Sequence, residues 1–163
     1  MIRVGILTVS DMGARGLRAD TSGEAIRQAL AQVGGQEARY AIVPDEREQI
    51  AGTLRQWADS GQMDVILTTG GTGLGPRDVT PEATRAVLER EAPGIVEAMR
   101  AETRKKTPFA MISRQVAGVR GRCLIVNLPG SPKAVRECLE VVLPVLPHAV
   151  QLIQGDTGSH PTG

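Results

Sequence analysis

Short apolar runs alternate with longer amphipathic stretches along almost the whole chain. Four runs rich in valine, isoleucine and leucine predict buried strands: residues 3–9, 38–43, 64–69 and 122–128. Between these runs, apolar residues recur at intervals of three and four, as at Ile26, Ala29 and Leu30, which predicts amphipathic helices. Strands that alternate with helices predict an α/β fold, in which an open, mostly parallel sheet carries helices on both faces.

Residues that favour helix starts precede several of the amphipathic stretches. Thr21, followed three residues later by Glu24, fits a capping box and is expected at the N-cap of the first long helix. Thr80 and Ser131 are each followed by a proline, which is well tolerated at the first helical position, so we expect both at N-caps. A further helix is expected to open within residues 44–48.

The 163 residues fit one domain, expected over residues 1–154. Residues 155–163 are small, polar and aperiodic, and we expect them to form a disordered tail. No apolar run approaches the length of about 18 residues that spans a bilayer. Asp11 ends the first apolar run, so the N-terminus is expected to be a strand and not a signal peptide. These features predict a soluble, cytoplasmic protein with no membrane partner.

Charge and composition narrow the classes of partner. The 19 basic and 18 acidic residues leave a formal net charge of +1, which argues against nucleic acid as a partner. Only three aromatic residues are present, too few for a surface on which bases stack. The two cysteines, Cys123 and Cys138, lack the spacing of a zinc site and are expected to be reduced core residues in an intracellular protein.

A glycine-rich loop follows the third predicted strand and precedes a predicted helix. Between Thr69 and Thr80 the chain places four glycines within six residues, which leaves backbone N–H groups bare for an anion such as phosphate. The loop has neither the Gly-Lys-Ser/Thr ending of a P-loop nor the spacing GxGxxG. The alternative is a flexible connection that needs positive φ, but its place at a strand end favours binding.

Acidic side chains follow three of the predicted strands. Asp78, next to Arg77, could hold Mg²⁺ against phosphate, although a solvated loop aspartate is an equal alternative. Asp45 could be the N-cap of the next helix, and taken alone this structural role is favoured. Asp45 also ends a strand at the same edge of the sheet, and Asp11 adds a third acid there.

The turn at 127–131 brings a fourth strand end to that edge, directly before a helix N-terminus. Neither histidine lies near the edge in the sequence, so no Ser/His/Asp or Cys/His nucleophile system is expected. Positioning and electrostatic stabilisation with a metal would suit phosphoryl or nucleotidyl transfer.

Five blocks of this sequence, at 8–11, 43–46, 69–83, 113–118 and 127–130, match blocks of one known family in the right order and cover nearly the whole chain. Together they resemble the molybdopterin adenylyltransferase family of molybdenum cofactor biosynthesis, which includes MogA, MoaB-like proteins and gephyrin-type G domains. Linked blocks of this kind are far more specific than one glycine-rich loop.

The resemblance implies a trimeric α/β protein that transfers AMP from Mg-ATP to the terminal phosphate of molybdopterin and releases pyrophosphate. The product would pass to the enzyme that inserts molybdenum. Asp45 and Asp78 would be the catalytic acidic pair, most simply through Mg²⁺. The substrate-binding candidates are Ser10, Asp11, Thr69, Gly70, Gly71, Thr72, Gly73, Arg77, Ser113, Asn127, Pro129, Gly130 and Ser131.

Three other interpretations compete with an active transferase. A family member without transferase activity could bind molybdopterin as a carrier or scaffold, and ATP turnover that depends on Asp45 and Asp78 would separate the two. The molybdenum-insertion enzyme shares this fold in its central domain, but it is much longer. An unrelated nucleotide enzyme with a similar glycine-rich loop is disfavoured by the blocks around Asp45 and Asn127.

Overall fold

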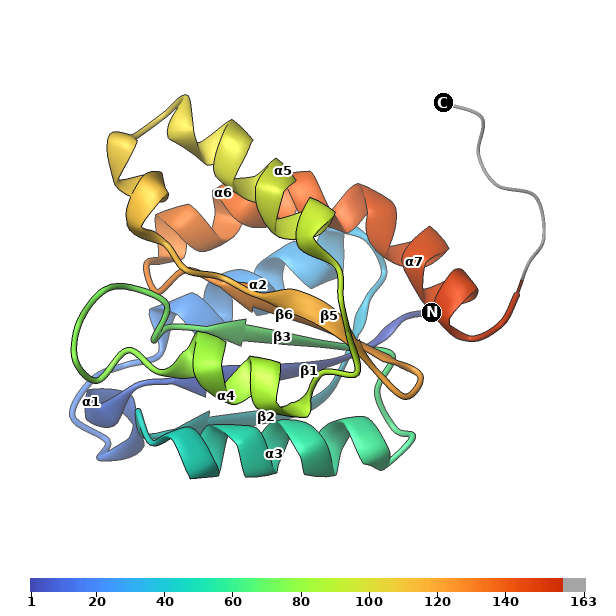
Figure 1. The fold of residues 1–163 in the computed structure, drawn as a ribbon, viewed down its shortest axis with the longest axis horizontal. Helices are drawn as coiled ribbons and strands as arrows, with labels where there is room; N and C mark the ends of the chain where they lie inside the picture. Colours follow the sequence, from blue (N-terminus) through green and yellow to red (C-terminus); the bar gives the residue numbers. More distant parts are fainter. Residues whose placement is uncertain (157–163) are drawn as a thin grey trace.

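Strands from both halves of the chain form one sheet in the computed structural model, which describes residues 1–156 (Figure 1). Its strands are β1 (Arg3–Val9), β2 (Gln36–Val43), β3 (Val65–Thr69), β4 (Arg90–Glu91), β5 (Ala117–Arg120) and β6 (Cys123–Leu128). They lie in the order β2-β1-β3-β6-β5-β4. The first four of this order are parallel, whereas β5 runs antiparallel to both β6 and β4. The predicted open, mostly parallel sheet is confirmed.

Helices cover both faces of the sheet, as predicted. The α-helices are α1 (Asp11–Ala14), α2 (Thr21–Gln32), α3 (Arg47–Asp59), α4 (Thr80–Val87), α5 (Pro93–Arg104), α6 (Pro132–Val142) and α7 (Leu146–Ile153), with 3₁₀ turns η1 (Pro108–Ile112) and η2 (Leu143–Val145). Helices α2, α5, α6 and α7 pack on one face, and α3 and α4 pack on the other (Figure 1).

Two apolar clusters, one on each face, explain why the strand sequences are almost continuously apolar. Successive side chains of a strand point to opposite faces, so Ile6 belongs to one cluster and Leu7 to the other. Leu67 and Ile66 are divided in the same way. A strand with helices on both sides has no polar face, and this is the pattern of a buried parallel sheet.

The antiparallel edge of the sheet, formed by β5 and β4, was not predicted. Its strands β5 and β4 are four and two residues long, too short to show an apolar pattern. Gly118 pairs with Glu91, and a Cβ atom on Gly118 would lie 2.3 Å from the carbonyl oxygen of Arg90. The strands can therefore approach only because this position has no side chain.

Three candidate N-caps each lie one residue away from the observed cap, although α3 begins within residues 44–48 as predicted. Asp20, not Thr21, is the N-cap of α2, and its Oδ1 accepts a 2.9 Å hydrogen bond from the Gly23 amide. Thr80 is the first residue of α4 and not its N-cap. Its hydroxyl donates to the Gly70 carbonyl oxygen instead of capping the helix. Asp45 precedes Glu46, the N-cap of α3, so its cap interpretation is also wrong. Ser131 caps α6 as predicted.

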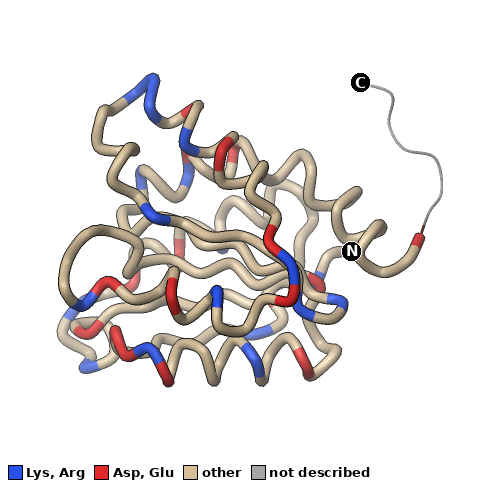
Figure 2. The backbone as a smooth tube through the Cα atoms, viewed as in Figure 1, with Lys and Arg blue, Asp and Glu red and all other residues tan. Residues whose placement is uncertain are grey.

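Other predictions concern the core and the ends of the chain. Cys123 and Cys138 are buried and unpaired, and burial raises the pKa of their thiols to about 12 and about 11. The amides of Gly155 and Asp156 donate to carbonyls of α7, and the rest of the predicted tail lies outside the described residues. Within residues 1–156, no helix is long and apolar enough to span a membrane. Figure 2 shows basic and acidic positions interspersed along the backbone.

Candidate active site

A cavity of about 470 Å³ opens at the carboxyl ends of the parallel strands. Residues at or after the ends of β1, β2, β3 and β6 line it, together with the first turns of α2 and α6. Figure 1 shows this edge at the left of the view, where α1 lies below the loop between β3 and α4. Open α/β sheets bind ligands at this edge.

The glycine-rich loop forms one wall of the cavity with a backbone that only glycine allows. Gly70 and Gly71 have φ of 96° and 69°. A Cβ atom on Gly70 would lie 2.3 Å from the Val9 carbonyl oxygen, and one on Gly71 would lie 2.2 Å from Thr80 Oγ1. The Thr80 hydroxyl donates to the Gly70 carbonyl oxygen at 2.9 Å. The loop is thus a fixed turn against β1 and α4.

Asp45 and Asp11 hold each other in place across the ends of β2 and β1. The Asp11 amide donates to Asp45 Oδ2 at 2.9 Å, and the Asp45 amide donates to Asp11 Oδ1 at 3.0 Å. Burial raises the pKa of Asp45, and the negative charges of Asp11 and Asp78 add to this effect. A cation between these carboxylates would relieve the repulsion.

Arg77 is bound to acidic side chains beside the cavity. Its Nε donates to Asp11 Oδ2 at 2.7 Å, and its Nη2 donates to Asp11 Oδ1 and to Glu46 Oε1. The hydrogen bond from Arg77 lowers the pKa of Asp11 to about 2. Asp11 is therefore ionised, and the positive charge of Arg77 already balances its negative charge. Neither residue lines the cavity.

Asp78 lines the cavity from the far end of the glycine-rich loop. Its Oδ2 accepts a 2.8 Å hydrogen bond from the Gly75 amide, which closes a turn within the loop. In the described part of the chain, no group of three or more His, Cys, Asp or Glu residues could hold a metal ion by itself. Asp45 and Asp78 nevertheless fit Mg²⁺, which proteins bind through one or two carboxylates together with substrate phosphates.

The other expected site residues divide into those at the cavity and those behind it. Ser10, Thr69, Gly130 and Ser131 line it with Gly70, Gly71 and the two aspartates. The Thr69 hydroxyl donates to the Pro129 carbonyl oxygen at 2.6 Å, so Pro129 joins the β3 and β6 ends. Thr72 and Gly73 lie further along the loop, outside the lining.

Asn127 and Ser113 are not brought to this cavity. The Asn127 side chain is fully buried, donates to Thr68 Oγ1 and Thr84 Oγ1 at 2.9 and 3.0 Å, and accepts from the Val116 amide at 3.0 Å. The Asn127 side chain therefore joins β6 to β3, to α4 and to the segment before β5, and it does not line the cavity. Ser113 lines a separate cavity of about 250 Å³, to which Ser131 also belongs.

Sequence reasoning missed the residues that line the cavity on the α2 side, residues 18–22, of which Asp20 and Ser22 fix its shape. Asp20 accepts a hydrogen bond from the Thr8 hydroxyl at 2.7 Å as well as capping α2. Ser22 donates to the Gly130 carbonyl oxygen at 2.6 Å and so fixes the turn before α6. The sequence Asp-Thr-Ser-Gly contains three residues of types that favour N-caps, and all three line the cavity, so only the fold shows that Asp20 is the one that caps α2.

Comparisons with known proteins agree over almost the whole chain. The family described as "Probable molybdopterin binding domain" matches residues 5–148. A molybdopterin adenylyltransferase of Helicobacter pylori is 46% identical over 157 residues, which cover 95% of this chain and 89% of the relative.

Two solved structures share the fold at substantial identity. The molybdopterin biosynthesis enzyme MoaB from Thermus thermophilus is 61% identical with a TM-score of 0.90, and the match covers 95% of this chain and 98% of that one. The molybdopterin biosynthesis Mog protein from Mycobacterium ulcerans is 40% identical with a TM-score of 0.87, covering 94% and 99%. Because family match, sequence identity and fold agree from β1 into α7, this chain belongs to the molybdopterin-binding family of molybdenum cofactor biosynthesis proteins.

Proposed function

We propose that this protein transfers AMP from ATP to the terminal phosphate of molybdopterin, as a step in molybdenum cofactor biosynthesis. One observation carries the proposal: a single cavity is lined both by the glycine-rich loop and by Asp45 and Asp78. Relatives named molybdopterin adenylyltransferase, 38–46% identical over most of the chain, support the same activity.

The reaction brings negatively charged groups together, and the cavity contains groups that stabilise them. An oxygen of the molybdopterin phosphate attacks the α-phosphorus of ATP, and pyrophosphate leaves with the electrons of the broken P–O bond. Gly70 and Gly71 of the loop and the first turns of α2 and α6 line this space, and helix N-termini attract phosphate oxygens. Asp45 and Asp78 would hold Mg²⁺, which supplies further stabilisation of charge on the phosphates.

The alternative is a catalytically silent carrier or scaffold that binds molybdopterin. It is not favoured, because full-length relatives of similar size are named as transferases. A carrier also has no need for two carboxylates directed at a phosphate-binding loop, since these would repel a bound phosphate unless a cation lay between them.

The test is an adenylylation assay with molybdopterin, ATP and Mg²⁺, in which mass detection follows adenylylated molybdopterin and pyrophosphate. Asp78→Asn should lower kcat by at least about 10²-fold, because it removes the carboxylate charge that would hold Mg²⁺ beside the reacting phosphates. Asp59→Asn is the matched control, since Asp59 is an exposed residue of α3 that pairs with Arg120. A folded, fully active Asp78→Asn variant would exclude the proposed role, and molybdopterin binding without product in the wild type would favour the carrier.

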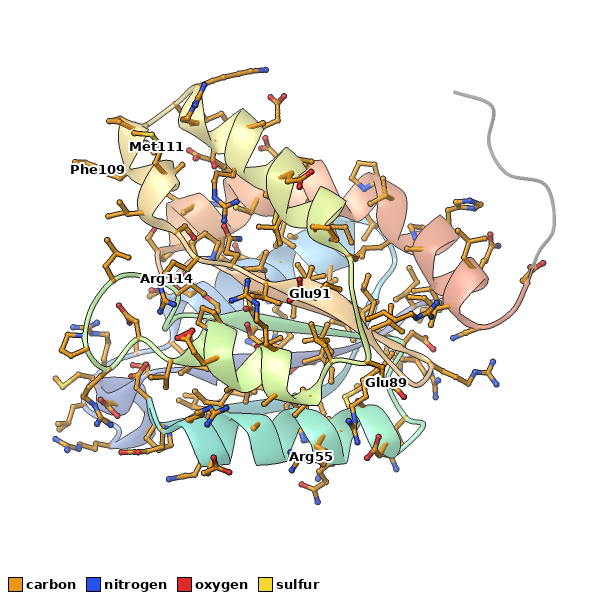
Figure 3. The ribbon with its side chains drawn as sticks, viewed as in Figure 1. Arg55, Glu89, Glu91, Phe109, Met111 and Arg114 are labelled. Carbon is orange, nitrogen blue, oxygen red and sulfur yellow. The ribbon has the colours of Figure 1, made fainter. Side chains whose placement is uncertain are left out.

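We also propose that the protein is a homotrimer that hands its product to the molybdenum-insertion enzyme. Exposed apolar side chains support self-association: Phe109 and Met111 are 75% and 60% exposed and project from η1 (Figure 3). Sedimentation equilibrium would determine the oligomeric state.

A further inference from the structure

One guanidinium group binds the glycine-rich loop on both sides of its exposed residues 74–77. Arg114 lies between η1 and β5, and its Nε donates to the Gly73 carbonyl oxygen at 2.8 Å. Its Nη2 donates to the Asp78 carbonyl oxygen at 2.7 Å. The exposed residues 74–77 therefore span two carbonyl groups that are fixed by the same planar side chain. Figure 3 labels Arg114 on the segment that leads into β5, near the start of α4.

Two further contacts fix Arg114 itself. Its Nη1 donates to both carboxylate oxygens of Glu82, at 3.0 and 2.9 Å, and Glu82 lies in the first turn of α4. Its backbone amide donates to the Thr72 carbonyl oxygen at 2.7 Å. The side chains of Arg114 and Glu82 are only 35% and 41% exposed, so the pair is partly shielded from water. Charge-assisted hydrogen bonds of this geometry are stronger than neutral ones.

The position of the Asp78 carboxylate depends on this arrangement. The Asp78 amide donates to the Gly75 carbonyl oxygen at 3.0 Å, and its Oδ2 accepts from the Gly75 amide. These bonds tie Asp78 to the loop, whereas Arg114 ties the loop to β5 and α4. A reacting group displaced by about 1 Å loses rate by about 10²-fold, so the anchoring of the loop has kinetic consequences.

We propose that Arg114, held by Glu82, is the positioning residue that fixes the glycine-rich loop and thereby directs Asp78 into the cavity. The inference rests on the proposed function for its kinetic readout only, because the immobility of the loop can be measured without substrate.

Arg114→Lys is the decisive variant. Lysine keeps the positive charge and can still pair with Glu82, but a single ammonium group cannot reproduce the fork that reaches two carbonyls and a carboxylate together. Arg120→Lys is the matched control, because Arg120 pairs with Asp59 through Nε and Nη2 and donates to the Val87 carbonyl oxygen through Nη1. That arrangement lies at the C-terminal end of α4, away from the cavity.

Two measurements test the proposal in the full-length protein. Amide exchange at Gly75 and Asp78 should be at least about tenfold faster in Arg114→Lys, and unchanged in Arg120→Lys. In the adenylylation assay, kcat should fall by about 10²-fold in Arg114→Lys, with the KM for ATP within about threefold of the wild-type value. Glu82→Gln, which keeps the shape and removes the charge, should change both readouts in the same direction.

Three outcomes would overturn the proposal. Wild-type exchange at these two amides in a folded Arg114→Lys variant would show that the loop is held by other contacts. Faster exchange with unchanged kcat would show that the position of the Asp78 carboxylate does not depend on the anchoring of the loop by Arg114. Equal losses in Arg120→Lys would assign the effect to general stability. If the wild-type protein forms no product, the proposed function fails, and amide exchange alone still decides whether Arg114 fixes the loop.

Discussion

Asn127→Asp tests whether Asn127 supports the fold or binds a ligand. The change preserves the size of the side chain but replaces two N–H donors with a carboxylate oxygen. Asn127 Nδ2 donates to two threonine hydroxyls, Thr68 and Thr84, at a position with no exposed surface. Because the Thr84 hydroxyl already donates to the Thr80 carbonyl oxygen, it has no proton for the new carboxylate.

The expected loss of stability follows from the burial of charge. A carboxyl group at a fully buried position has its pKa raised by about 3 or more. Each unit of pKa corresponds to about 1.4 kcal/mol, so a rise of this size in the folded state alone costs about 4 kcal/mol of stability at pH 7. The lost hydrogen bond to Thr84 adds about 1 kcal/mol. The total, about 5 kcal/mol, is comparable with the whole stability of many single domains.

The sign of the pH dependence is fixed by the same argument. Between about pH 4 and pH 7 the folded variant keeps a proton that the unfolded chain has lost, so its stability falls as the pH rises. Relative to wild type at each pH, the free energy of unfolding should therefore be lower by about 5 kcal/mol at pH 7 and by about 1 kcal/mol below pH 4.

Urea unfolding followed by circular dichroism at pH 4 and pH 7 measures both differences. Gln56→Glu, the same amide-to-acid change at an exposed position of α3, is the control and should alter stability by less than about 0.5 kcal/mol at either pH. A variant as stable as wild type at pH 7 that loses substrate binding would refute the reasoning and place Asn127 in a ligand site.

Two further changes test the loop and the edge of the sheet. Gly71→Ala should lower the free energy of unfolding by about 3 kcal/mol and reduce activity, because φ is positive at Gly71 and the new Cβ would displace Thr80. The control is Gly52→Ala, in open space on α3, which should instead raise the free energy of unfolding by about 0.5–1 kcal/mol. Although burial raises the pKa of Asp64, the hydrogen bonds and charge of Arg3 outweigh it and lower the pKa. Asp64→Asn should therefore cost about 2 kcal/mol at pH 7, and the difference in thermal unfolding should persist down to pH 3.8 and be lost as the pH falls further, through the lowered pKa of Asp64.

Much of the architecture can be predicted from local patterns. The parallel strands could be predicted because a strand covered on both faces must be apolar at nearly every position, as in β1 and β3. The direction of the chain then places Asp45, Gly70 and Gly130 at one edge, since parallel strands all end there. Short β4 and β5 could not be predicted, because two and four residues show no period.

Helix caps show where a local pattern becomes ambiguous. Thr21 and Asp20 are adjacent and both are good N-cap residues, so the sequence does not choose between them. Asp20 is chosen because the Thr8 hydroxyl on β1 donates to the same carboxylate. Likewise, Thr80 turns from its own helix to the Gly70 carbonyl oxygen. In each case a partner distant in the sequence outweighs the local preference.

The sequence by itself determined the fold class and the glycine-rich loop, because periodicity and glycine-rich turns are properties of short segments. The role of Asp45 and Asp78 as a catalytic pair follows from the family resemblance and stays a prediction. Only the tertiary structure decided which polar groups face the cavity. It turned Asn127 into the core, joined Arg77 to Asp11, and set Arg114 across the loop. These roles depend on contacts between residues 30 to 70 positions apart, and the directions of such side chains are fixed only when the sheet brings the segments together.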